Sequence, residues 1–113
     1  MCRTIPVLIG GILGSLLATA VASAQDSIAW SRSLPEAQQQ AAQQQRLVLL
    51  HFWDDNCPPC RRVERDVFPD ANVVRAVNSN YVPVKIKVRE MPQLRRQYDV
   101  TSWPTDVILS LIH

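Results

Sequence analysis

Cys57 and Cys60 are the residues of this chain whose types and spacing point most directly to a reaction. Two thiols separated by two residues can close a small, reversible disulfide, and the thiolate is the form of cysteine that attacks another disulfide. The pair follows a compact apolar run at 47–53 and precedes a charged segment of helical character at 61–67. If a helix begins near Pro58, Cys57 lies at its N-terminus, where the macrodipole favours a thiolate. The spacing therefore predicts thiol–disulfide chemistry.

The beginning of the chain has the layout of a secretory signal peptide. Residues 1–3 carry a positive charge, an apolar stretch follows at 5–21, and Ala-Ser-Ala at 22–24 has the small-x-small form of a cleavage site. We expect residues 1–24 to be removed and the protein to be exported, to the periplasm or the extracellular space, with no stable membrane association after cleavage. The alternative is an uncleaved N-terminal anchor helix, but the apolar stretch is short and broken by glycines.

Residues 25–113 are enough for one small domain, near the lower end of what a single hydrophobic core can stabilise. The whole chain has a net charge of +2 and its basic residues are scattered, so the composition does not favour a nucleic-acid partner. Cys57 and Cys60 remain after cleavage, in an oxidising compartment where disulfides persist. A disulfide between them closes so small a loop that a redox role is favoured over a stabilising one.

Apolar periodicity and turn residues predict an alternation of helices and strands. Ser33 and Glu36 have the spacing of a capping box, with Pro35 in the first turn of the helix that follows. Nearly continuous apolar residues at 47–53 predict a buried strand. In chain order, the expected elements are a helix at 34–45, a strand at 47–53, a helix at 58–68, a helical continuation at 70–77, a strand at 81–88, a helix at 91–98 and a strand at 105–111. Strands that alternate with helices favour an α/β sheet with parallel neighbours.

This order of elements, with a dithiol after the first central strand and an isolated proline before a later one, resembles the thioredoxin family. The matching segments are Phe-Trp-Asp-Asp-Asn-Cys-Pro-Pro-Cys at 52–60 and Val-Thr-Ser-Trp-Pro-Thr at 100–105, and the resemblance covers residues 47–109. It implies an α/β, thioredoxin-like fold in which helices flank a central mixed sheet. The family's fold continues with a further strand and a final helix, so the domain at 25–113 is expected to be incomplete at its C-terminus.

The resemblance assigns a role to each matching residue. Cys57 is expected to be the exposed nucleophile, and Cys60 the buried resolving cysteine that attacks the mixed disulfide. Pro104 matches the family's cis-proline, and Trp103 and Pro104 are expected to hold an incoming substrate strand. Trp53 matches an aromatic residue that packs near the active-site turn, where it serves either core packing or substrate contact.

His51 departs from the family pattern, because many thioredoxins have a buried aspartate at this position of the strand. Strand alternation places His51 on the same face as Leu49 and Trp53. One hypothesis is that neutral His51 is the base that takes the proton of Cys60, since histidine titrates near neutrality. The alternative is a buried histidine that is bonded to the backbone or to water.

Pro58 is a second departure, because the common thioredoxin turn has glycine at this position. Proline lacks an N–H group, so Pro58 and Pro59 leave chiefly the N–H of Cys60 to stabilise a Cys57 thiolate. Fewer donors disfavour the thiolate, whereas the helix dipole favours it. The sequence therefore does not decide between a reductant, an oxidant and an isomerase.

The function predicted from these residues is thiol–disulfide exchange on protein substrates, by an oxidoreductase that needs no bound cofactor or metal. Its partners are expected to be proteins with disulfides or dithiols, and a redox partner that the sequence does not identify. One alternative is the binding of copper or zinc by Cys57, Cys60 and His51, since thiolates and imidazole suit soft metal ions. Another is a non-catalytic interaction module that keeps the fold as a peptide-binding scaffold. Covalent haem attachment is disfavoured, because Arg61 rather than histidine follows the second cysteine.

Overall fold

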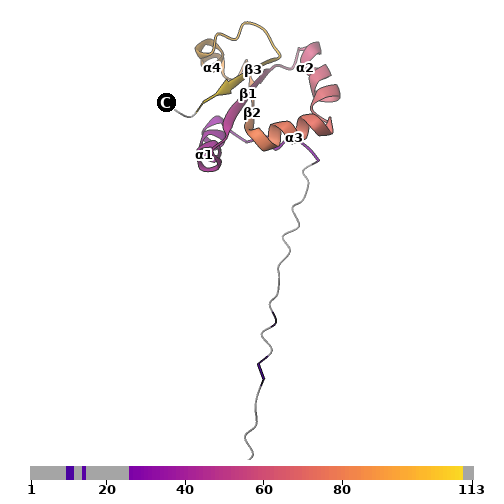
Figure 1. Ribbon diagram of the computed structural model, residues 1–113. Coiled ribbons are helices and arrows are strands. Elements are labelled where there is room, and N and C mark those ends of the chain that lie inside the picture. The colour runs from indigo at the N-terminus through magenta and orange to yellow at the C-terminus, as the bar shows by residue number, and fades with distance from the viewer. Residues whose placement is uncertain (1–9, 12–13, 15–25, 111–113) are drawn as a thin grey trace, which may run out of the picture.

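The computed structural model describes residues 10, 11, 14 and 26–110 (Figure 1). The expected signal peptide at 1–24 lies outside the described residues, apart from three glycines. In chain order, the elements are α1 (Leu34–Gln44), β1 (Leu47–Trp53), α2 (Pro58–Arg62), the π-helix η1 (Val63–Val67), α3 (Ala71–Asn80), β2 (Tyr81–Lys87), α4 (Pro92–Gln97) and β3 (Thr105–Leu109). None of the helices in this part of the chain is long and apolar enough to cross a lipid bilayer.

β1 is the central strand of a three-stranded mixed sheet with the order β2-β1-β3. It runs parallel to β2, with Trp53 opposite Lys87, and antiparallel to β3, with Phe52 opposite Thr105. The mixed sheet between helices confirms the expected fold class. The expectation of parallel neighbours holds for β2 and is wrong for β3. The connection through α4, a helix of only 6 residues, does not carry the chain back along the sheet, so β3 enters at the end where β2 finishes.

The sheet separates two layers of helices. Figure 1 shows α1 and α4 on one side of the strands, and α2 and α3 on the other. Val48, Leu50 and Phe52 of β1 are fully buried in the core on the side of α1 and α4. Strand alternation turns His51 and Trp53 toward the other side. One face of β1 thus packs in the apolar core, and the other face carries His51 and Trp53.

The segment at 58–68 differs from the single helix that the sequence predicts. Its first part is the α-helix α2, but the N–H of Phe68 donates to the carbonyl of Val63 at 3.0 Å, which is the hydrogen-bond spacing of the π-helix η1. The wider turn brings the Phe68 ring against two aromatic neighbours, at centroid distances of 5.1 Å from Trp30 and 4.8 Å from His51. Apolar periodicity cannot show this change of helix type.

The remaining predicted elements are confirmed with shifted ends. Ser33 caps α1 by accepting a hydrogen bond from the Glu36 N–H at 3.2 Å, and α1 ends one residue earlier than predicted. α3 begins after its cap at Asp70 and continues to Asn80, beyond the predicted end at 77. β2 and α4 lie within their predicted ranges, as does β3 within the described residues. Ser31 also forms a parallel bridge to Val84, which the sequence does not predict and which covers part of the outer edge of β2.

Asp70→Ala is expected to lower the free energy of unfolding by about 1 kcal/mol. The Asp70 carboxylate accepts hydrogen bonds from the N–H groups of Asn72 at 2.8 Å and Val73 at 3.2 Å, and alanine leaves both donors without this partner. Urea unfolding monitored by circular dichroism measures the loss. Asp70→Asn, which keeps an acceptor oxygen, is the control and should lose less. Equal losses in both variants would contradict a capping role for Asp70.

Candidate active site

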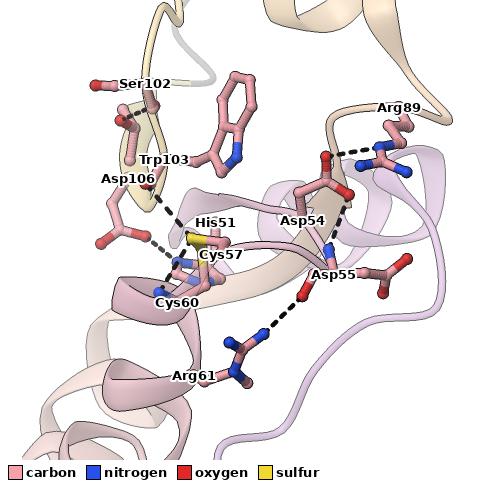
Figure 2. The surroundings of a disulfide bond; sticks show 11 residues. His51, Asp54, Asp55, Cys57, Cys60, Arg61, Arg89, Ser102, Trp103 and Asp106 are labelled. Atoms are coloured by element: carbon pink, nitrogen blue, oxygen red, sulfur yellow. Dashed lines mark hydrogen bonds and ion pairs between the residues drawn. A yellow bond between two sulfur atoms is a disulfide. The ribbon is translucent and has the colours of Figure 1, made fainter.

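The turn between β1 and α2 holds the two cysteines in a disulfide (Figure 2). Cys57 is the N-cap of α2 in extended conformation, and its sulfur accepts a hydrogen bond from the Cys60 N–H at 3.1 Å. Pro58 and Pro59 occupy the first helical positions, where a missing N–H breaks no helical hydrogen bond. The predicted position of Cys57 at a helix N-terminus is confirmed, and so is the Cys60 N–H as a donor to its sulfur.

Both cysteines are buried, with 3% of Cys57 and 2% of Cys60 exposed. The expectation that Cys57 is exposed is therefore wrong for this oxidised state. The cause is the loop before β3, since the carbonyl oxygen of Trp103 lies 3.5 Å from the Cys57 sulfur.

The same loop contains the cis peptide bond between Trp103 and Pro104, which the resemblance predicts. The Thr105 hydroxyl donates to the Ser102 carbonyl at 2.6 Å and closes the loop on itself. The Trp103 side chain packs partly against the hydrophobic core, and the Arg95 guanidinium lies 5.8 Å from the centroid of its ring. The structure thus places the carbonyl oxygen of Trp103, the residue before the cis-proline, next to the Cys57 sulfur.

Asp54 anchors the turn that precedes Cys57. Its buried carboxylate accepts hydrogen bonds from the Asp55 N–H at 2.8 Å and from Nε of Arg89 at 3.0 Å. Arg61 of α2 donates to the Asp55 carbonyl at 2.9 Å. These bonds tie the β1–α2 turn both to the helix that follows it and to the loop after β2.

Trp53 lies in a shallow pocket that Cys60, Arg61 and Glu64 also line. The Lys87 ammonium lies 5.4 Å from the centroid of the Trp53 ring and forms an ion pair with Asp55 at 2.7 Å. The hydrogen bond to Asp55 is the main reason that the pKa of Lys87 is raised above its ordinary value. Trp53 is therefore next to the disulfide, although this position does not separate core packing from substrate contact.

His51 is fully buried on the same side of the sheet as α2. Its Nδ1 lies 2.7 Å from the Asp106 carboxylate, and its Nε2 has no hydrogen-bond partner within the described part of the chain. The partner of Nδ1 is thus a carboxylate on β3. The sequence analysis did not identify Asp106. The feature that could have indicated it is an acidic residue in a strand whose next three residues are apolar.

Across residues 10, 11, 14 and 26–110, no group of three or more His, Cys, Asp or Glu side chains is arranged to hold a metal ion. The two sulfurs are bonded to each other, and Nδ1 of His51 is paired with Asp106. The predicted metal-site alternative of Cys57, Cys60 and His51 thus gains no support from this arrangement.

Comparison with known proteins gives consistent matches. The family model for thioredoxin-like proteins matches residues 29–110. Thioredoxin-1 of Drosophila melanogaster is 34% identical over 64 residues, a match that covers 57% of each chain. The chain thus spans little more than half the length of this curated relative.

Two solved structures are similar over most of the chain. A thioredoxin from Thermus thermophilus has a TM-score of 0.67 and 32% identity, over 74% of this chain and 65% of that one. A putative disulphide-isomerase from Bacteroides thetaiotaomicron has a TM-score of 0.65 and 31% identity, over 74% of this chain and 72% of that one. The present chain has a mixed sheet and a cysteine pair at the start of α2, and the family model matches most of its length. These findings show that the chain belongs to the thioredoxin-like family.

Proposed function

We propose that this protein catalyses thiol–disulfide exchange on protein substrates in an extracytoplasmic compartment. The observation that carries the proposal is the Cys57–Cys60 disulfide at a helix N-terminus, in contact with the loop that contains Pro104. A helix N-terminus and the Cys60 N–H both stabilise negative charge on the Cys57 sulfur. The site therefore favours the thiolate that the reaction requires.

The reaction has two exchange steps in the reducing direction. The Cys57 thiolate attacks a substrate disulfide, forms a mixed disulfide and releases one substrate thiolate, which takes a proton from solvent. The Cys60 thiol then loses its proton, and its sulfur attacks Cys57. The second substrate thiolate leaves, so the substrate disulfide is reduced while the enzyme dithiol is oxidised. The reverse sequence oxidises a substrate dithiol.

Substrate binding is assigned to the loop at 102–104. Trp103 offers a carbonyl group within 3.5 Å of the reacting sulfur, and its ring borders a shallow pocket with Arg89, Arg95 and Pro92. An extended polypeptide can bond to the backbone of this half-buried loop while its disulfide faces Cys57. The redox partner that restores the working state of the dithiol is a further protein thiol or disulfide.

The experiment is the redox equilibrium of the full chain carrying Cys2→Ser, measured across glutathione buffers by alkylation and mass spectrometry. A reversible two-electron transition of Cys57 and Cys60 is expected, and its midpoint sets the direction of exchange. Cys60→Ser is the matched control and should show no intramolecular transition. Equal, slow alkylation of both cysteines at every buffer ratio would contradict the proposed function.

The compartment is a separate part of the proposal and is supported by the composition of residues 1–24. It is tested by intact mass spectrometry of the protein recovered from the exported fraction of a producing cell. A chain that begins at Gln25 is expected. Recovery of the uncleaved chain only, inside the cell, would contradict export.

A further inference from the structure

We propose that His51 and Asp106 form a proton-transfer pair that serves Cys60 during exchange, with His51 moving the proton and Asp106 acting as its positioning residue. The inference rests on the proposed function, because a resolving cysteine that must lose a proton has meaning only in disulfide exchange. It adds a residue, Asp106, that neither the cysteine motif nor the position of Pro104 indicates.

The sheet register brings the two side chains together. His51 of β1 and Asp106 of β3 are directly opposite each other in the antiparallel pair, and Nδ1 lies 2.7 Å from the carboxylate oxygen. An ionised carboxylate only accepts hydrogen bonds, so Nδ1 must carry the proton of the neutral ring. Nε2 is then left with a free lone pair, which is the form of histidine that accepts a proton.

The free nitrogen is enclosed on the side of the sheet that carries the disulfide. His51 is 0% exposed, and Nε2 has no hydrogen-bond partner within the described residues. The ring packs against Phe68, which directly follows the α2–η1 segment that contains Cys60, with centroids 4.8 Å apart. His51 therefore packs against the C-terminal end of the helical segment whose first turn contains Cys60.

One loop joins the two parts of the site. Trp103, near the end of the loop before β3, lies against the Cys57 sulfur, and Asp106, three residues later in β3, holds His51. Figure 2 shows the histidine, the carboxylate and the disulfide in the same surroundings. Direct transfer from Cys60, or transfer through one bridging water, is the step that this arrangement serves.

The other charged groups near His51 are paired with each other. From β2, Lys85 is the register partner of His51, and its ammonium lies 4.9 Å from the centroid of the Trp30 ring. From η1, Glu64 forms an ion pair with this lysine. Asp106 from β3 is thus the carboxylate that contacts the imidazole, and it stabilises the imidazolium that forms when a proton arrives.

In the proposed step, one proton moves from Cys60 to His51 while one disulfide bond replaces another. In the mixed disulfide, the Cys60 thiol gives its proton to Nε2, and the resulting thiolate attacks the Cys57 sulfur. The bond between Cys57 and the substrate sulfur breaks, and the substrate leaves as a thiolate. The His51 imidazolium then returns the proton to this thiolate or to solvent. When a reductant opens the disulfide, His51 first takes a proton from solvent, and its imidazolium then protonates the departing Cys60 thiolate.

The experiment follows the resolving step itself in the full chain carrying Cys2→Ser. Reduced protein is mixed with oxidised glutathione, quenched with acid and analysed by mass spectrometry between about pH 5 and pH 8. Wild type should accumulate little of the Cys57–glutathione adduct. In His51→Gln the adduct should accumulate, because its resolution slows by about a hundredfold, and the histidine inflection should vanish from the pH profile.

Asp106→Asn tests the positioning role. Its resolving rate should fall by about tenfold, because a neutral amide stabilises the imidazolium less. Asp106→Glu should restore part of the rate. The matched control is Asp66→Asn, since Asp66 is equally exposed at 55% against 53% and holds Arg65 at the same 2.7 Å. The control should keep the wild-type profile.

A readout that needs no variant is the tautomer of His51, seen by nitrogen-15 NMR of the oxidised full chain. The expected neutral form carries its proton on Nδ1, and a proton on Nε2 would overturn the proposal. Unchanged rates and profiles in His51→Gln and Asp106→Asn, with wild type active, would overturn the pair alone. A wild-type protein that never forms the glutathione adduct would overturn the proposed function with it.

Discussion

Cys57→Ser is expected to lower the rate of disulfide exchange by about a thousandfold or more, the largest effect of any substitution in this chain. The hydroxyl of serine is not ionised near neutral pH and cannot form the mixed disulfide. The sulfur that remains, at Cys60, is as buried as that of Cys57 and lies within the first turn of α2, whereas Cys57 is the N-cap. The measurement is the initial rate of reduction of a dye-quenched peptide disulfide, in the Cys2→Ser background.

Cys60→Ser distinguishes the two sulfurs. This variant keeps the attacking thiol but cannot resolve the intermediate, so it should accumulate a covalent adduct with one half of the substrate, visible as a mass increase. Cys57→Ser should form no such adduct. The opposite pattern, with the adduct on Cys60, would mean that the assigned roles of the two cysteines are reversed.

Phe52→Ala is expected to lower the free energy of unfolding by about 3 to 5 kcal/mol, the largest effect on stability. Phe52 is fully buried in the core on the side of α1 and α4, and removal of its ring leaves a cavity in the central strand. A domain of this size has a total stability of only about 5 to 15 kcal/mol, so the variant will be partly unfolded at moderate temperature.

The matched control for Phe52→Ala is Ile108→Ala, on the edge strand β3. Ile108 is 52% exposed, so its truncation should cost less than about 1 kcal/mol. Urea unfolding of the oxidised proteins measures both losses. A loss for Phe52→Ala no larger than that for Ile108→Ala would show that the core between the sheet and α1 does not govern stability.

Local signals account for the parts of the fold that the sequence predicts well. Apolar continuity at 47–53 predicts β1 with its observed ends, and the cap at Ser33 predicts the beginning of α1. The π-helix η1 escapes prediction because the local apolar pattern does not separate a π-turn from an α-turn, and Phe68, which follows it, contacts the distant residues Trp30 and His51. The antiparallel direction of β3 depends in the same way on how far α4 carries the chain.

The candidate site also contains residues that local motifs predict and residues that only the tertiary structure brings together. Cys57, Cys60 and the cis-proline Pro104 follow from motif spacing and family resemblance, and the structure places them together. The position of Asp106 opposite His51 depends on the register between β1 and β3, and the sequence alone does not predict this register. The burial of Cys57 is a property of the Trp103 loop, whose approach no local pattern reveals.

The order in which this sheet can form has a consequence for the nascent chain. β1 has no strand partner until β2 has been synthesised, and the pair of His51 and Asp106 joins residues 55 positions apart. Such distant pairings close late, because each must first offset the entropy of a long loop. Both thiols therefore leave the ribosome well before the strand and loop that enclose them. Until then the Trp103 loop does not enclose Cys57, and the growing chain depends on its cellular surroundings to keep these thiols from the wrong partners.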